Sequence, residues 1–139
     1  MISYKIIDTE EFLQGLFREA TWDNFFFVRA EFSSFVRAEL ADAAACKWAQ
    51  VRPVAAMLLA QDEEEKDFQV TLRPDWDLSG NEVFHGVERV YLHLRFERGE
   101  ACAVTGISYE TFVPGKTAER EWDRLAGLFL KKNHIAFEG

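Results

Sequence analysis

The stretch RVYLHLRFERGEACAVTGISY, residues 89–109, decides the fold. Residues 89–97 alternate strictly between two faces, which is the period of a β-strand buried on one side. The apolar face carries Val90, Leu92, Leu94 and Phe96, and the other face carries Tyr91, His93, Arg95 and Glu97. Arg98-Gly99 then predicts a tight turn into a second strand, Ala101–Tyr109, with Ala101 opposite Phe96 and Ala103 opposite Leu94. We expect an antiparallel hairpin whose polar face meets water or a partner.

Segment 25–40 holds a near-duplication, FVRAEF at 27–32 and FVRAEL at 35–40. In a β-hairpin, a three-residue loop that pairs Ala30 with Ala38 keeps the apolar residues on one face, whereas a two-residue turn at Ser33-Ser34 mixes the faces. A helix over the same residues also fits the apolar spacing, so both alternatives stay open at this point. In the strand interpretation, three aromatic residues lie on the face opposite the apolar one: Phe25, Phe27 and Phe35. Such a patch is either covered by a helix or used for binding.

Two more strands and three helices complete the predicted fold. Alternation predicts short strands at 3–7 and 68–72, and apolar residues at helical spacing predict helices near 9–20, 47–60 and 118–132. Asp8 and Thr117 are the expected N-caps of the first and last helices. Pro53 is expected at the first position of a helix, after an extended Arg52. We therefore expect an α+β fold, in which a mainly antiparallel, twisted sheet of about five to six strands has about three helices packed mostly on one face.

The length of 139 residues is in the usual range for one domain, so we expect a single α+β domain spanning residues 1–139. Hydrophobic residues make up 48% of the chain, which is enough to build a core and excludes a disordered protein. The net charge of -8 argues against a general nucleic-acid binder, because that binding needs a basic surface. The N-terminus does not resemble a secretion signal, and the longest apolar run, 54–60, is too short to cross a bilayer. Two separated cysteines, Cys46 and Cys102, indicate reduced thiols, so we expect a cytoplasmic protein without a membrane segment.

Several motifs together are similar to one protein family. They are KWAQVRP at 47–53, LHLRFERG at 92–99, TGIS at 105–108, and WD, FLKK and HIAFE between 122 and 138. The pattern resembles an uncharacterised family, a domain of unknown function, of small proteins from anaerobic Gram-positive bacteria. The resemblance implies a cytoplasmic location and strand structure for residues 25–40. It carries no assigned substrate, cofactor or catalytic residue, and residues 74–87 match the family pattern least well.

The loop DWDLSGN, residues 75–81, partly matches a calcium-binding loop. Asp75, Asp77 and Ser79 stand at positions 1, 3 and 5 of the motif, but Gly86 stands where a bidentate Glu closes such a site. An ordinary polar turn is the better account, so we predict no metal. The three histidines are scattered, and neither a nucleotide-binding fingerprint nor a nucleophile motif occurs. We therefore predict no cofactor and assign no catalytic residue.

Two groups of side chains are candidates for a ligand or an interaction. Tyr91, His93 and Arg95 share the polar face of the 89–97 strand, where they could form a general acid/base group with carboxylates from elsewhere. An exposed sheet face with paired charges explains the same residues. Arg52 near Trp48 could bind an anion through its guanidinium fork, or it could form a structural clasp with the indole ring.

These observations leave three hypotheses about function. The leading one is a non-enzymatic cytoplasmic domain that binds a protein partner or forms a homo-oligomer, because catalytic motifs are missing and one face mixes aromatic and charged residues. The alternative is a small-ligand-binding protein or enzyme that uses Arg52, His93 and Arg95 with acidic partners. The second alternative is a nucleic-acid-associated protein with one basic face, which requires a set of cations to lie together: Arg89, Arg95, Arg98, Arg120, Arg124 and Lys131.

Overall fold

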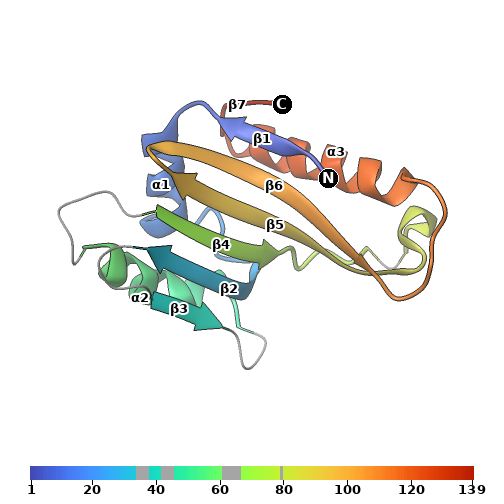
Figure 1. Cartoon of the computed structure of the whole chain (residues 1–139), viewed down its shortest axis with the longest axis horizontal. Helices are drawn as coiled ribbons and strands as arrows, with labels where there is room; N and C mark the ends of the chain where they lie inside the picture. The colour runs from blue at the N-terminus through green and yellow to red at the C-terminus, as the bar shows by residue number, and fades with distance from the viewer. Residues whose placement is uncertain (34–37, 42–45, 61–66, 79) are drawn as a thin grey trace.

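A computed structural model describes residues 1–33, 38–41, 46–60, 67–78 and 80–139 (Figure 1). The described strands form one antiparallel sheet in the order β3-β2-β4-β5-β6-β1-β7. Their bounds are β1 Ser3–Ile6, β2 Phe26–Ser33, β3 Ala38–Ala41, β4 Asp67–Arg73, β5 Val87–Glu97, β6 Glu100–Tyr109 and β7 Phe137–Glu138. The helices are α1 Thr9–Phe17, α2 Trp48–Ala60, α3 Thr117–Lys132 and the short 3-10 helix η1 Glu82–Phe84. The predicted α+β class is confirmed, and β7, near the end of the sequence, adds an edge strand beside β1.

The β5-β6 hairpin lies at the centre of the sheet and has the predicted register. Phe96 pairs with Ala101 and Leu94 pairs with Ala103. The turn residues Arg98 and Gly99 both have positive φ, 53° and 79°, which is the backbone of a tight hairpin turn whose twist matches the strands. This part of the sequence therefore determined its own structure locally.

All three α-helices lie on one face of the sheet, behind it in Figure 1. Alternate residues of the central strands are buried against them, including Val70, Leu72, Leu92 and Leu94, none of which is exposed. The indoles of Trp48 and Trp122 also satisfy their polar atoms within the core: Trp48 Nε1 donates to the Leu16 carbonyl and Trp122 Nε1 to the Tyr91 carbonyl. The helices and one sheet face thus make the core, and within the described residues no helix covers the second sheet face.

Strand β2 corrects two predictions about segment 25–40. β2 and β3 are strands, so the helix alternative for this segment is wrong. Phe25 and Phe27 are each only 3% exposed and belong to the core, not to the face opposite the apolar residues. The reason is an irregularity between Phe27 and Arg29: one extra residue there reverses the alternation, so Phe27 faces the same side as Ala30 and Phe32. The β2-β3 register pairs Ala30 with Leu40, two residues away from the predicted partner. Phe35 lies outside the described residues.

The helices also differ from the prediction at their starts. Pro53 lies inside α2, so Arg52 is helical and not extended. Proline lacks the N–H that would donate to the carbonyl of Ala49, so one hydrogen bond is missing, but the residues before and after Pro53 remain helical. Asp8 caps α1, with its carboxylate accepting from the Glu11 N–H, as expected. The cap position of α3 is Lys116, without a side-chain cap bond, so the prediction for Thr117 was wrong by one position.

No helix in the described residues has the length and apolar character needed to span a bilayer.

Candidate functional site

None of the helices in the described residues lies on the second face of the sheet, and we call three rows of side chains on that face the open face. Strand pairing places the rows across the sheet. The first row is Lys5, Cys102, Arg95, Gln69 and Glu31. The second row is Ser3, Val104, His93, Thr71 and Arg29. The third row is Gly106 and Tyr91, with Arg73 at the adjacent end of β4.

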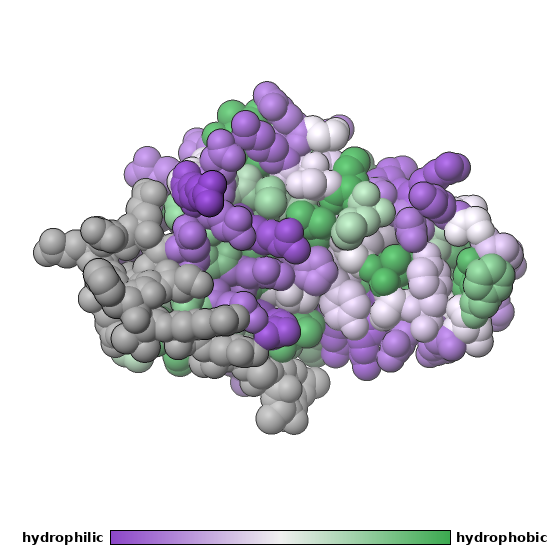
Figure 2. All heavy atoms as spheres, viewed as in Figure 1, coloured by the Kyte–Doolittle hydropathy of each residue, from purple (hydrophilic) through white to green (hydrophobic). Residues whose placement is uncertain are grey.

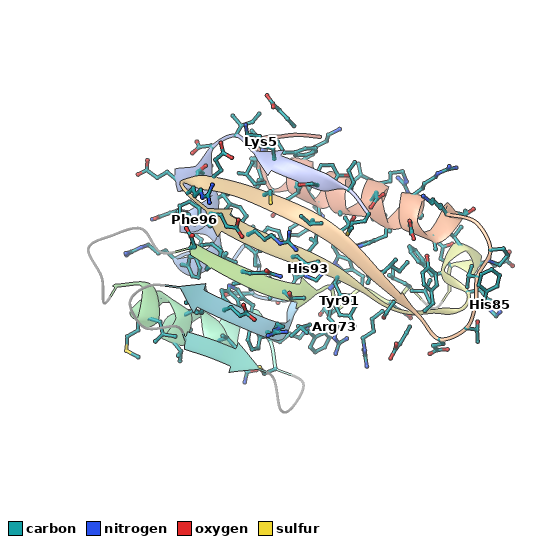
Figure 3. The ribbon with its side chains drawn as sticks, in the orientation of Figure 1. Lys5, Arg73, His85, Tyr91, His93 and Phe96 are labelled. Atoms are coloured by element: carbon teal, nitrogen blue, oxygen red, sulfur yellow. The ribbon has the colours of Figure 1, made fainter. Side chains whose placement is uncertain are left out.

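The figures show how this face is composed. Hydrophilic side chains spread across it and are interrupted by apolar ones (Figure 2). Tyr91 and His93 follow one another along β5, between Lys5 on β1 and Arg73 at the end of β4 (Figure 3). Since neighbouring strands are about 4.8 Å apart, all of these side chains lie within reach of one bound segment.

His93 is the centre of the second row and is held from three sides. Its Nδ1 lies 2.9 Å from the hydroxyl of Thr71, a residue that is only 4% exposed. The ring is nearly parallel to that of Tyr91, with centroids 6.2 Å apart. On β6 the ring meets Gly106, where a Cβ atom would lie 2.8 Å from Nε2. The imidazole therefore occupies a fixed position on the open face.

Because Gly106 has no side chain, β6 leaves room for the His93 ring. We expect Gly106→Ala to lower the free energy of unfolding by about 1 kcal/mol, because the added methyl displaces a ring that is bonded to Thr71. Urea unfolding measures the loss. Gly80→Ala is the control, since a Cβ there meets nothing within 4 Å. Equal stability of the two variants would contradict this account of the site.

Burial, and secondly the positive charge of Arg95, lower the pKa of His93 below its ordinary 6.5. The folded state therefore favours the neutral ring, and its contribution to stability is present above the unfolded-state pKa and lost as the pH falls through the lowered folded-state pKa. We expect NMR titration of the His93 ring to give a midpoint below 6.5. His93→Gln should lose less stability than the natural chain on acidification. A midpoint at or above 6.5 would contradict the expected burial.

In the first row, one cation stands on each side of a thiol. Cys102 of β6 is the register partner of Lys5 on one side and of Arg95 on the other. The Nε atom of Arg95 is buried and has no hydrogen-bond partner in the described residues. A cavity of about 460 Å³ opens over this end of the sheet, lined by Ser3, Lys5, Arg95, Glu97, Arg98, Glu100, Ala101 and Cys102.

The open face differs in charge from the rest of the protein. Its three rows carry four cations, Lys5, Arg29, Arg73 and Arg95, together with the carboxylate Glu31. The register continues the first row to Glu138 of β7, beside Lys5, and to Glu39 of β3, beside Glu31. Glu31 accepts a hydrogen bond from Arg29 at 2.6 Å. The chain as a whole has a net charge of -8. The cations thus stand on the inner strands of the face, and carboxylates stand at its edges, including Glu97 and Glu100 at the end of the β5-β6 hairpin.

The structure does not bring Arg52 to the open face. Arg52 and Trp48 lie on α2, and the guanidinium of Arg52 makes two hydrogen bonds to the carboxylate of Asp23, at 2.9 and 3.0 Å. Trp48 is fully buried and its indole bonds to Leu16. Arg52 is therefore held by Asp23 and Trp48 by Leu16, which differs from the clasp between Arg52 and the indole ring described above. The combination of Arg52 with His93 and Arg95 is not formed.

The remaining sequence candidates are also dispersed. The Asp75 carboxylate is bonded to Lys47 Nζ at 2.6 Å, and Ser79 of the calcium-like motif lies outside the described residues. Within the described part of the chain, no group of three His, Cys, Asp or Glu residues is placed to hold a metal ion. The cations needed for a nucleic-acid face divide between β5 and its turn, which hold Arg89, Arg95 and Arg98, and α3, which lies behind the sheet.

Sequence reasoning found Tyr91, His93 and Arg95 but missed four of their neighbours: Lys5, Thr71, Cys102 and Gly106. Alternation within β5 was enough to place the first three on one face. The others lie on β1, β4 and β6, so they join the face only through the strand order and register. Gly106 gave the one local signal, a glycine within a predicted strand, which often marks the close approach of another group.

Comparison with known proteins gives one match. A family model described as a family of unknown function (DUF5721) matches residues 27–138, which include β2 through to β7. The resemblance to an uncharacterised family is confirmed at that level. No curated protein and no solved structure matches the chain.

Proposed function

The chain belongs to the family of unknown function DUF5721, and on that premise we propose that it is a cytoplasmic, non-enzymatic domain that binds an acidic segment of a protein partner across its open face. The observation that carries the proposal is the charge of this face. Four cations, Lys5, Arg29, Arg73 and Arg95, stand on its inner strands, and carboxylates stand at its edges, although the chain as a whole has a net charge of -8. Opposite charges attract a partner of matching sign and fix its position.

The residue types of the face support the same function. Tyr and Arg are enriched at the centres of protein interfaces, and Tyr91, Arg73 and Arg95 supply them here. Tyr91 and His93 are half-buried and their rings stack on one another. Little side-chain entropy is therefore lost when a partner covers them.

A protein partner is favoured over a nucleic acid by the charge at the edges of the face. The β5-β6 turn is flanked by Glu97 and Glu100, and Glu138 of the edge strand β7 is the register partner of Lys5. These carboxylates repel a long polyanion that extends beyond the face, whereas a short acidic segment fits between them.

Fluorescence anisotropy with a labelled eight-residue peptide, alternating Glu and Tyr, tests the proposal. We expect saturable binding that weakens as salt is raised, because exposed charges are screened within about 10 Å at 0.1 M salt. The matched peptide with Lys in place of Glu is expected not to bind. Absence of saturable binding, or tighter binding of a single-stranded oligonucleotide, would overturn the proposal. Light scattering on the same sample shows whether a second copy covers the face instead, which would also overturn it.

A further inference from the structure

We propose that the Lys5 end of the open face contains a site for a small molecule bearing an oxyanion, a carboxylate or a phosphate group. This site goes beyond binding of a protein segment and does not depend on it. The cavity of about 460 Å³ over β1, β5 and β6 has the size of a small-ligand site.

Strand register builds the floor of this site. Lys5, Cys102 and Arg95 stand side by side on three neighbouring strands. The two cations are therefore about 10 Å apart, with the thiol between them. Ser3, two residues before Lys5 on the same face, adds a hydroxyl to the lining. An oxyanion above Cys102 lies within reach of a long cationic side chain from either side.

The cations of the lining are not neutralised by ion pairs. Lys5, Arg95 and Arg98 have no ion-pair partner among the described residues. The buried Nε of Arg95 is an unused hydrogen-bond donor, and a buried donor without a partner is costly. A ligand oxygen that accepts from the Nε–H of Arg95 itself removes that cost.

Two carboxylates also line the cavity and restrict the ligand. Glu97 and Glu100 are register partners at the hairpin end, one step beyond Arg95 and Cys102. Their charge disfavours a ligand with negative groups at both ends of the cavity. The ligand class is therefore a small molecule whose oxyanion lies at the Lys5 side.

The Arg95 Nε–H group gives its own NMR signal and serves as the probe. We expect a saturable shift of this signal on titration with inorganic phosphate or with succinate, up to about 20 mM at constant ionic strength. A response to phosphate alone assigns a tetrahedral oxyanion, and a response to succinate alone assigns a carboxylate. Saturable response to neither anion would overturn the proposal.

Variants and a second signal separate binding from a general salt effect. Alkylation of Cys102 by iodoacetamide, followed by mass spectrometry, should slow by at least about fivefold when the anion saturates the site. Lys5→Gln and Arg95→Gln should abolish this protection, Arg95→Lys should retain part of it, and Arg120→Gln on α3 should leave it unchanged. Equal protection in all four variants would overturn the proposal. Peptide binding has no part in this assay, so failure here is distinct from failure of the proposed function.

Discussion

Replacing Trp122 with alanine is expected to lower the free energy of unfolding by about 3–5 kcal/mol. The indole is 1% exposed on the inner side of α3 and packs against the ring of Trp76, with centroids 5.8 Å apart. Its Nε1 donates to the carbonyl of Tyr91 at 3.0 Å, which joins α3 to β5 directly behind the open face. Truncation removes the apolar contacts, leaves a cavity and deprives that carbonyl of its partner.

Trp122→Phe separates the two contributions. It keeps an aromatic ring but removes the hydrogen bond to Tyr91, so a smaller loss, about 1–3 kcal/mol, is expected. Urea unfolding monitored by circular dichroism measures both variants. A loss below about 1 kcal/mol for Trp122→Ala would contradict the assignment of α3 to the core.

The second large effect concerns binding by the open face. Reversing two of its charges together, Arg73→Glu with Arg95→Glu, is expected to reduce the affinity for the Glu-Tyr peptide at least about tenfold, or about 1.4 kcal/mol. The double change makes the sign of the face negative, and like charges repel the acidic peptide. Fluorescence anisotropy at low salt measures the effect.

The control for this variant makes the same change in net charge on the opposite side. Arg120→Glu with Lys132→Glu alters two cations of α3, which lies behind the sheet. We expect this variant to keep affinity within about threefold, because its charges are separated from the peptide by the sheet and are screened. Equal weakening in the two double variants would show that net charge and not the open face determines binding. Thermal unfolding of each variant confirms that it is folded.

The parts of the fold that the sequence predicted are those with a local cause. The 89–109 hairpin has strict alternation and a turn dipeptide, and both act within a few residues. The helices follow from apolar spacing and from the Asp8 cap. The irregularity after Phe27 could not be read in the same way, because an extra residue in one strand depends on the neighbouring strand β4. Its effect was large: it placed Phe25 and Phe27 on the core side of the sheet, opposite to the face predicted for them.

The candidate site was predictable along β5 and not across the sheet. Tyr91, His93 and Arg95 share a face because they are two residues apart. Cys102 and Lys5 join Arg95 only when β1 pairs with β6, and β1 lies at the opposite end of the chain. The hypothesis of a ligand site also included Arg52, because guanidinium groups bind anions generally. The structure gives it a different partner, Asp23.

The most direct test of the open face as a binding surface is an NMR map of amide shifts during titration with the Glu-Tyr peptide. We expect the shifted residues to cluster on the described strands β1, β4, β5 and β6, around Lys5, Thr71, His93 and Cys102. The signals of α1 and α3, on the other side of the sheet, should stay unchanged. Shifts concentrated on the helices, with the open face unaffected, would contradict the account.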